Sequence, residues 1–373
     1  MKVNKFFGLL MILASAFLFV NCTSDPQPGP PGQDGIDGID GIDGTDGADG
    51  TASCVSCHAN STREPIFEAF ALSAHGAGGT FARGNRASCA QCHGSEGFID
   101  YVTMGAIDTT GLTPEGIAPK YNPAMAVNCN TCHSSHRTFD FENDGPDYAL
   151  RNPDPSDLVL APGITIDFGD ASNNCITCHQ PRNSYEIPTT NTSGVYVVTS
   201  TRFGPHHSPQ STMLEGILGA EISGSTGYPA RASATHRTGS SCVQCHMGDA
   251  TAADEGGHSW NPTEAACVQC HPNGAPEGIE NFEADMSTLL ALLTQVEGEG
   301  YDEDEDGNII PNGEPVIGIL QENGRSRQGI FPTAAAQAAW NYKTLEEDQS
   351  KGTHNPNYSK ALLKNSLEAL QND

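Results

Sequence analysis

Two cysteines three positions apart, with a histidine directly after the second, recur along this chain. The pattern Cys-x-x-Cys-His is the attachment signature of c-type haem. Both thiols form thioether bonds to the haem, and the histidine on the following turn ligates the iron. Six copies occur in 373 residues. The cysteines are Cys54, Cys57, Cys89, Cys92, Cys129, Cys132, Cys175, Cys178, Cys242, Cys245, Cys267 and Cys270, and the histidines are His58, His93, His133, His179, His246 and His271.

Other uses of paired cysteines explain the pattern less well. Structural zinc needs four ligands per metal and gives no reason for a histidine after every pair. Disulfides suit an exported protein, but they do not require six pairs with this spacing. A thioredoxin-like redox motif lacks its βαβ surroundings. The sequence therefore predicts six covalently attached haems, which would also supply apolar bulk to a chain with only 37% apolar residues.

Further histidines are available as second axial ligands. His136 lies three residues beyond His133, on the same side of that haem, so we expect it to ligate a neighbouring haem. The rings of the adjacent His206 and His207 must diverge. One of them is expected to bind iron, and the other to bind a second iron or a propionate. The seven candidates are His75, His136, His206, His207, His236, His258 and His354.

The residues that must position these groups fall into two regions. In residues 53–276, the haem motifs are separated by connections rich in Gly, Pro, Ser and Asn, which predicts short helices wrapped around a chain of covalent haems. In residues 277–373, apolar residues at helical spacing over 286–296 and 363–370, with an alanine-rich run between them, predict three packed helices. These helices would present His354 to a haem. The expected fold class is mainly α with extensive loops.

The N-terminus carries export features. Residues 1–21 have a basic start and a short apolar run, which is typical of a signal peptide. Cys22 then matches the lipid-attachment residue of a bacterial lipoprotein, although a plain secretory signal is the alternative. Residues 22–52 contain a glycine at every third position from Gly29 to Gly50, mostly followed by x-Asp. This collagen-like stretch is interpreted as a hydrophilic spacer because it has too little proline for a stable triple helix.

The net charge of the chain limits the kinds of partner that it can bind. The formal net charge of -28, from 46 acidic and 18 basic residues, argues against nucleic-acid binding and favours cationic partners or metal ions. Asp302, Asp304 and Asp306 match the first half of an EF-hand loop, so Ca²⁺ is a second candidate cofactor. Gly313 stands where the bidentate glutamate belongs, and a solvated acidic turn is the alternative.

The chain resembles the bacterial multihaem c-type cytochromes that move electrons across and beyond the outer membrane. The resemblance rests on the six motifs, on the Gly-Pro-His-His-Ser stretch at 204–208, and on the closing "DQSKGTHNPNYSKALLKNSLEAL". That closing string is similar to the C-terminal helix of the group that includes ammonia-forming nitrite reductase. There, a His-Asn-Pro step supplies a distal ligand, which implies this role for His354. The lysine-ligated motif of those reductases is absent from the sequence.

The resemblance implies an electron carrier, not an enzyme, with bis-histidine haems. Its location would be the outer membrane, as a lipoprotein on the cell surface or the periplasmic side. Its partners would be other cytochromes and extracellular electron acceptors. Two alternatives stay open at this point: a multihaem reductase of nitrogen or sulfur oxyanions, which needs a five-coordinate iron, and a subunit of a polymeric cytochrome filament.

Overall fold

The computed structural model describes residues 52–145, 147–182, 185–189, 194–250 and 252–371. The predicted signal peptide, Cys22 and the glycine-repeat spacer lie outside these residues. The described residues belong to one compact unit. None of the helices in this part of the chain is long and apolar enough to cross a membrane.

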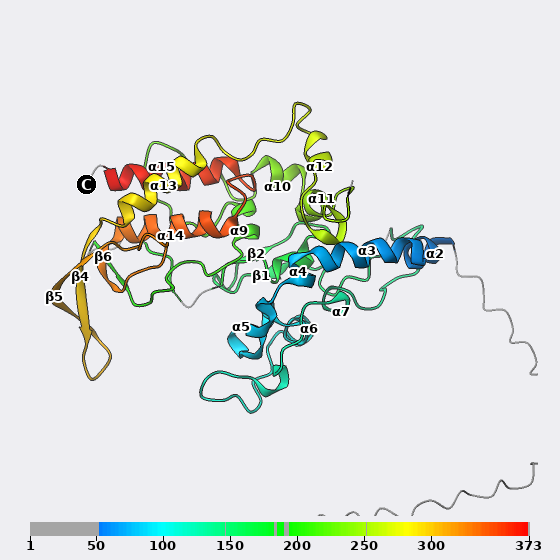
Figure 1. Ribbon diagram of the computed structural model, residues 1–373, viewed down its shortest axis with the longest axis horizontal. Coiled ribbons are helices and arrows are strands. Elements are labelled where there is room, and N and C mark those ends of the chain that lie inside the picture. Colours follow the sequence, from blue (N-terminus) through cyan, green and yellow to red (C-terminus); the bar gives the residue numbers. More distant parts are fainter. Residues whose placement is uncertain (1–51, 146, 183–184, 190–193, 251, 372–373) are drawn as a thin grey trace, which may run out of the picture. The chain divides into compact units, whose positions relative to one another are not determined.

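The cysteine motifs begin on short helices (Figure 1). The absence of a side chain at Gly97 allows its helix to approach the helix of Ala90, because a Cβ on Gly97 would lie 2.3 Å from the Ala90 carbonyl oxygen. The motif helices are α2 (Ala52–His58), α5 (Ala87–His93), α7 (Cys129–Cys132), α8 (Asn173–Ile176), α11 (Cys242–His246) and α12 (Glu264–Val268). Between them lie α3 (Asn60–Leu72), α4 (Ala74–Ala77), α6 (Ser95–Met104), α9 (Gln210–Glu215), α10 (Thr235–Gly239) and the 3-10 turns η1 (Thr80–Asn85), η2 (Pro119–Tyr121) and η3 (Gly257–Ser259).

Three longer helices form the C-terminal part: α13 (Phe282–Leu293), α14 (Thr333–Asp348) and α15 (Pro356–Gln371). They pack against one another, which confirms the predicted three-helix arrangement (Figure 1). Leu289, Trp340 and Leu362 are fully buried in their shared core. The Trp340 indole N–H donates to the carbonyl oxygen of Leu218 at 3.0 Å. The core therefore includes residues before position 277, and the two predicted regions fold together.

A four-stranded antiparallel sheet accompanies these helices, so the fold is less purely α than the sequence suggested. The strands are β3 (Val195–Val198), β4 (Glu297–Glu303), β5 (Ile309–Ile317) and β6 (Gly329–Pro332), in the order β3-β6-β4-β5. A second, two-stranded sheet pairs β1 (Ser156–Asp157) with β2 (Thr165–Ile166). The larger sheet was missed because β5 is mostly exposed and shows no alternation of apolar and polar residues.

The stretch predicted as a calcium loop covers the end of β4, the turn that follows and the start of β5 (Figure 1). Asp302 lies on β4, and Asp304 and Asp306 lie in the turn. Asp304 accepts hydrogen bonds from the backbone N–H groups of Asp306 (2.9 Å) and Asn308 (2.8 Å). An EF-hand loop joins two helices, whereas strands flank this one. Among the described residues, no group of three or more His, Cys, Asp or Glu side chains is arranged to hold a metal ion. Calcium binding by Asp302, Asp304 and Asp306 therefore stays a prediction, beside the alternative of a solvated acidic turn.

Candidate haem sites

In the third, fourth and sixth motifs, the backbone N–H of the histidine donates to the backbone carbonyl oxygen of the first cysteine at 2.9 Å. This bond keeps both thiols and the imidazole on a single turn, as attachment to one haem requires. The pairs are His133 with Cys129, His179 with Cys175 and His271 with Cys267.

Five of the six motif histidines lie opposite a second histidine from another part of the chain. The ring centroids in these pairs are 6.0 to 6.3 Å apart. The pairs are His58 with His136, His75 with His179, His133 with His258, His236 with His271, and His246 with His354.

This separation fits one metal between two imidazoles. A histidine nitrogen lies about 2 Å from a bound metal, which puts its ring centroid about 3 Å from that metal and two opposed centroids about 6 Å apart. Ring planes vary from 32° to 79° between partners, which ligation permits because each ring can rotate about its metal–nitrogen bond. The spacing and the donor type therefore both fit an axial histidine pair on a haem iron.

The remaining motif histidine, His93, lies near both His206 and His207. Burial, then the charge of His207, lowers the pKa of His93. The rings of His206 and His207 lie 4.4 Å apart, and His206 takes a left-handed φ of 71°, an uncommon conformation for a residue with a side chain. The loop thus brings both His206 and His207 near His93 of the second motif.

The non-motif histidines reach their partners from distant segments. His136 follows the third motif but lies beside His58 of the first. His236 precedes the fifth motif but lies beside His271 of the sixth. His354 lies beside His246 of the fifth motif. Each of these contacts joins two segments that the sequence order leaves apart.

Many of these rings have their Nδ1 atom fixed, which leaves Nε2 for a metal. Backbone carbonyl oxygens fix the Nδ1 atoms of His133 (Tyr148, 2.8 Å), His246 (Trp260, 2.8 Å) and His236 (Thr353, 2.6 Å). Side chains fix those of His179 (Gln210, 3.3 Å), His207 (Glu347, 2.7 Å) and His354 (Asp348, 2.7 Å). These hydrogen-bond partners were not predicted from the sequence because all of them except Asp348 lie more than ten residues from their histidines.

Electrostatics divides the histidines into two groups. Burial, then the charge of His179, lowers the pKa of His75 to about 4. Burial, then His207, likewise lowers the pKa of His206 to about 4. These rings are neutral near pH 7, as metal ligation requires. In contrast, a hydrogen bond to Glu347 raises the pKa of His207. Burial alone would lower the pKa of His354, but the charge and hydrogen bond of Asp348 act in the opposite direction, and the pKa is raised.

The fourth motif touches three others. The Cys178 thiol donates to the carbonyl oxygen of Gln91 at 3.8 Å, and the Cys92 thiol of the second motif donates to the carbonyl oxygen of Thr177 at 3.7 Å. Cys175 lies close to Cys242 of the fifth motif. Beside them, the Asn174 side chain lies close to Cys132 of the third motif. Four of the Cys-x-x-Cys-His motifs are therefore gathered around α8.

Trp260 lies among several of the pairs. Its ring centroid is 4.5 Å from that of His75 and 5.4 Å from that of His258. Its backbone carbonyl oxygen hydrogen-bonds to Nδ1 of His246. It takes a left-handed φ of 55° at the end of η3. Trp260 thus contacts one histidine from each of the pairs that include the third, fourth and fifth motifs. No signal in the sequence singled it out.

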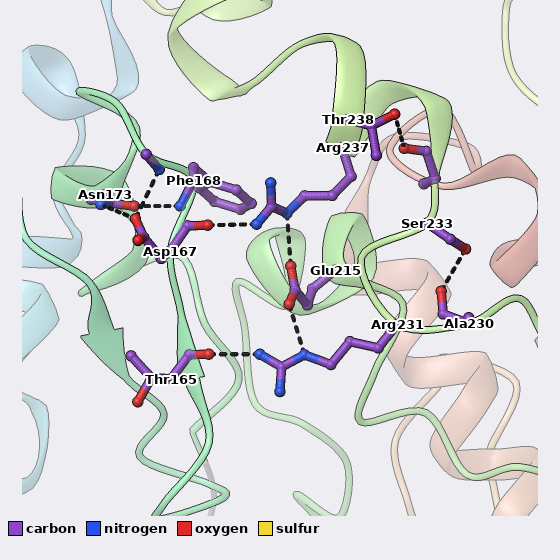
Figure 2. A network of polar contacts seen from close by, with 12 residues as sticks. Thr165, Asp167, Phe168, Asn173, Glu215, Ala230, Arg231, Ser233, Arg237 and Thr238 are labelled. Carbon is purple, nitrogen blue, oxygen red and sulfur yellow. Dashed lines mark hydrogen bonds and ion pairs between the residues drawn. The ribbon is translucent and has the colours of Figure 1, made fainter.

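A buried carboxylate supports α10, the helix that carries His236. Glu215 on α9 accepts hydrogen bonds from Nε of Arg231 (2.7 Å) and Nε of Arg237 (2.8 Å) (Figure 2). The two guanidinium groups also donate to the carbonyl oxygens of Thr165 and Asp167, so they join α9 and α10 to the β2 segment. This network fixes the position of α10.

No protein-family model matches the chain, and no curated protein matches it. Among solved structures, the chain is similar to the outer cell wall cytochrome OcwA, with 19% identity and a TM-score of 0.46, over 82% of this chain and 50% of that one. It is also similar to an undecahaem cytochrome from the S-layer of Carboxydothermus ferrireducens, with 16% identity and a TM-score of 0.41, over 77% of this chain and 38% of that one. The chain spans half or less of the length of these two proteins.

Proposed function

We propose that the chain is a hexahaem c-type cytochrome that relays single electrons, with two histidines on every iron. The observation that carries the proposal is the set of opposed imidazole rings with centroids 6.0 to 6.3 Å apart, each with one ring in a Cys-x-x-Cys-His motif. The axial pairs are His58 with His136, His93 with His207, His133 with His258, His179 with His75, His246 with His354, and His271 with His236.

For the second haem, His207 is preferred over His206. The Nδ1 atom of His207 is held by Glu347 at 2.7 Å, which leaves Nε2 directed to a metal, as in His354 and His236. Within the described residues, no hydrogen bond fixes the Nδ1 atom of His206, and His206 is assigned a place beside the same haem without ligation.

Bound haem supplies one-electron chemistry, and the residues of the chain determine how it is used. Two imidazoles per iron leave no position for a substrate, so electron carriage is favoured over catalysis. The closeness of the fourth motif to the second, third and fifth motifs supports a junction at the fourth haem. Electrons would therefore pass through a branched set of haems.

The proposed location rests on the N-terminal sequence. Residues 1–21 would direct export, Cys22 would carry lipid, and the glycine-repeat spacer would hold the haem unit away from an outer membrane. A net charge of -28 favours redox partners with a cationic docking face, such as other cytochromes. Extracellular acceptors complete the proposed path.

Intact mass and spectroscopy of the mature, haem-loaded protein test the proposal. We expect a mass increment of six haems and low-spin spectra in both oxidation states that carbon monoxide does not change. His354→Ala should create one high-spin haem that binds carbon monoxide, whereas the control His206→Ala should create none. A high-spin, ligand-binding iron in the wild type would overturn bis-histidine ligation throughout and would favour a reductase of nitrogen or sulfur oxyanions.

A further inference from the structure

The C-terminal turn of α14 contacts axial-ligand candidates of two different haems. Neighbouring residues supply the contacts: Glu347 bonds to Nδ1 of His207, and Asp348 bonds to Nδ1 of His354, both at 2.7 Å. The turn is itself held in place by Gln210, whose amide donates to the carbonyl oxygen of Glu347 at 3.0 Å. One turn of helix thus supplies a carboxylate hydrogen-bond partner to both His207 and His354.

The other fixed rings have neutral partners. His133, His236 and His246 bond to backbone carbonyl oxygens, and His179 bonds to the amide of Gln210. The ring of His136 has a carboxylate nearby, but its Nδ1 lies 3.7 Å from Asp147 and makes no hydrogen bond. A direct carboxylate bond therefore distinguishes His207 and His354 within the described residues.

A carboxylate on Nδ1–H makes the imidazole a stronger electron donor through Nε2 and adds a negative charge beside the metal. Both effects stabilise ferric over ferrous iron, which lowers the reduction potential. We propose that the α14 turn lowers the reduction potentials of the second and fifth haems, with Glu347 and Asp348 as the tuning residues. This inference rests on the proposed axial pairs.

Burial ranks the two effects. The Asp348 side chain is 1% exposed and that of Glu347 is 18% exposed. A charge in the drier site is less screened by water. Lys343 and Arg83 also place positive charge near His207, which offsets part of the Glu347 charge. The larger effect is therefore assigned to Asp348 and the fifth haem.

A spectroelectrochemical titration of the full-length, haem-loaded protein tests this. Asp348→Asn keeps the shape of the side chain and removes its charge. One of six one-electron steps should move upward by at least tenfold in its equilibrium constant, about 59 mV, while all haems stay low-spin. Glu347→Gln should move a different step by less. Glu346→Gln is the matched control, because Glu346 lies on the same turn but pairs with Lys343 at 2.6 Å; it should move no step by a comparable amount.

Each other result has one meaning. If no step moves in Asp348→Asn and all haems remain low-spin, the tuning inference is wrong while the proposed function stands. A high-spin haem that appears only in Asp348→Asn would make Asp348 a positioning residue and would also overturn tuning. A high-spin haem already present in the wild type would instead overturn the proposed axial pairs.

Discussion

Replacing Glu215 by glutamine removes the negative charge shared by Arg231 and Arg237. The Glu215 side chain is 4% exposed, so its carboxylate is stabilised by these two guanidinium groups rather than by water. Removing one partner of a buried ion pair costs about 3–5 kcal/mol. Here the cost is reduced because the Arg231 side chain is 44% exposed and can be solvated, whereas that of Arg237 is 17% exposed. The glutamine oxygen also keeps one hydrogen bond, so we expect a loss of about 2 kcal/mol in the free energy of unfolding.

Denaturant unfolding of the haem-loaded protein measures this loss. The same variant should loosen α10, because Arg237 follows His236 directly, and part of the sixth haem should become high-spin. Arg231→Lys is the control: it keeps the charge at the more exposed position and should lose about 1 kcal/mol or less with no change of spin state. An unfolding free energy for Glu215→Gln within about 0.5 kcal/mol of wild type would refute the role of the network.

Two further predictions concern the core and the anchor. Asn341 is fully buried and binds both the N–H and the carbonyl oxygen of Ala220 at 2.8 Å, so Asn341→Ala should destabilise the protein by about 3 kcal/mol in denaturant unfolding. The exposed Asn312→Ala should change stability by less than about 0.5 kcal/mol, and equal losses in both variants would contradict the reasoning. Cys22→Ala should release the protein from outer-membrane fractions into the soluble fraction. A wild type that is already soluble and begins downstream of Cys22 would remove the basis for the anchor.

The sequence was most informative where the signal is local. The haem motifs and the three C-terminal helices depend on spacings of one to four residues, and α13, α14 and α15 lie where that spacing predicted them. The hairpin of β4 and β5 was missed for the opposite reason. Its acidic strands are stabilised by pairing with each other and with β6, which leaves no periodic pattern to detect.

The histidine pairs could be predicted as a group but not individually. The count of non-motif histidines limits how many irons can have two imidazoles, yet nothing local assigns His258 to His133 or His75 to His179. Those pairings depend on how the loops between the motifs return. The carboxylates of Glu347 and Asp348 and the ring of Trp260 are likewise recognised only once α14 and η3 are placed in space.

These long-range pairs explain how residues 53–276 can fold with a small core. The apolar clusters around Tyr121 and around Ile166 are small, and the large core lies mainly with the C-terminal helices and the sheet. In a haem-loaded chain, each proposed axial pair would act as a cross-link between two distant segments. Metal binding then contributes to folding free energy, because no preformed site exists in the unfolded chain. The residues that hold His236 and His354 in place would therefore affect both the redox properties of the haems and the stability of the fold.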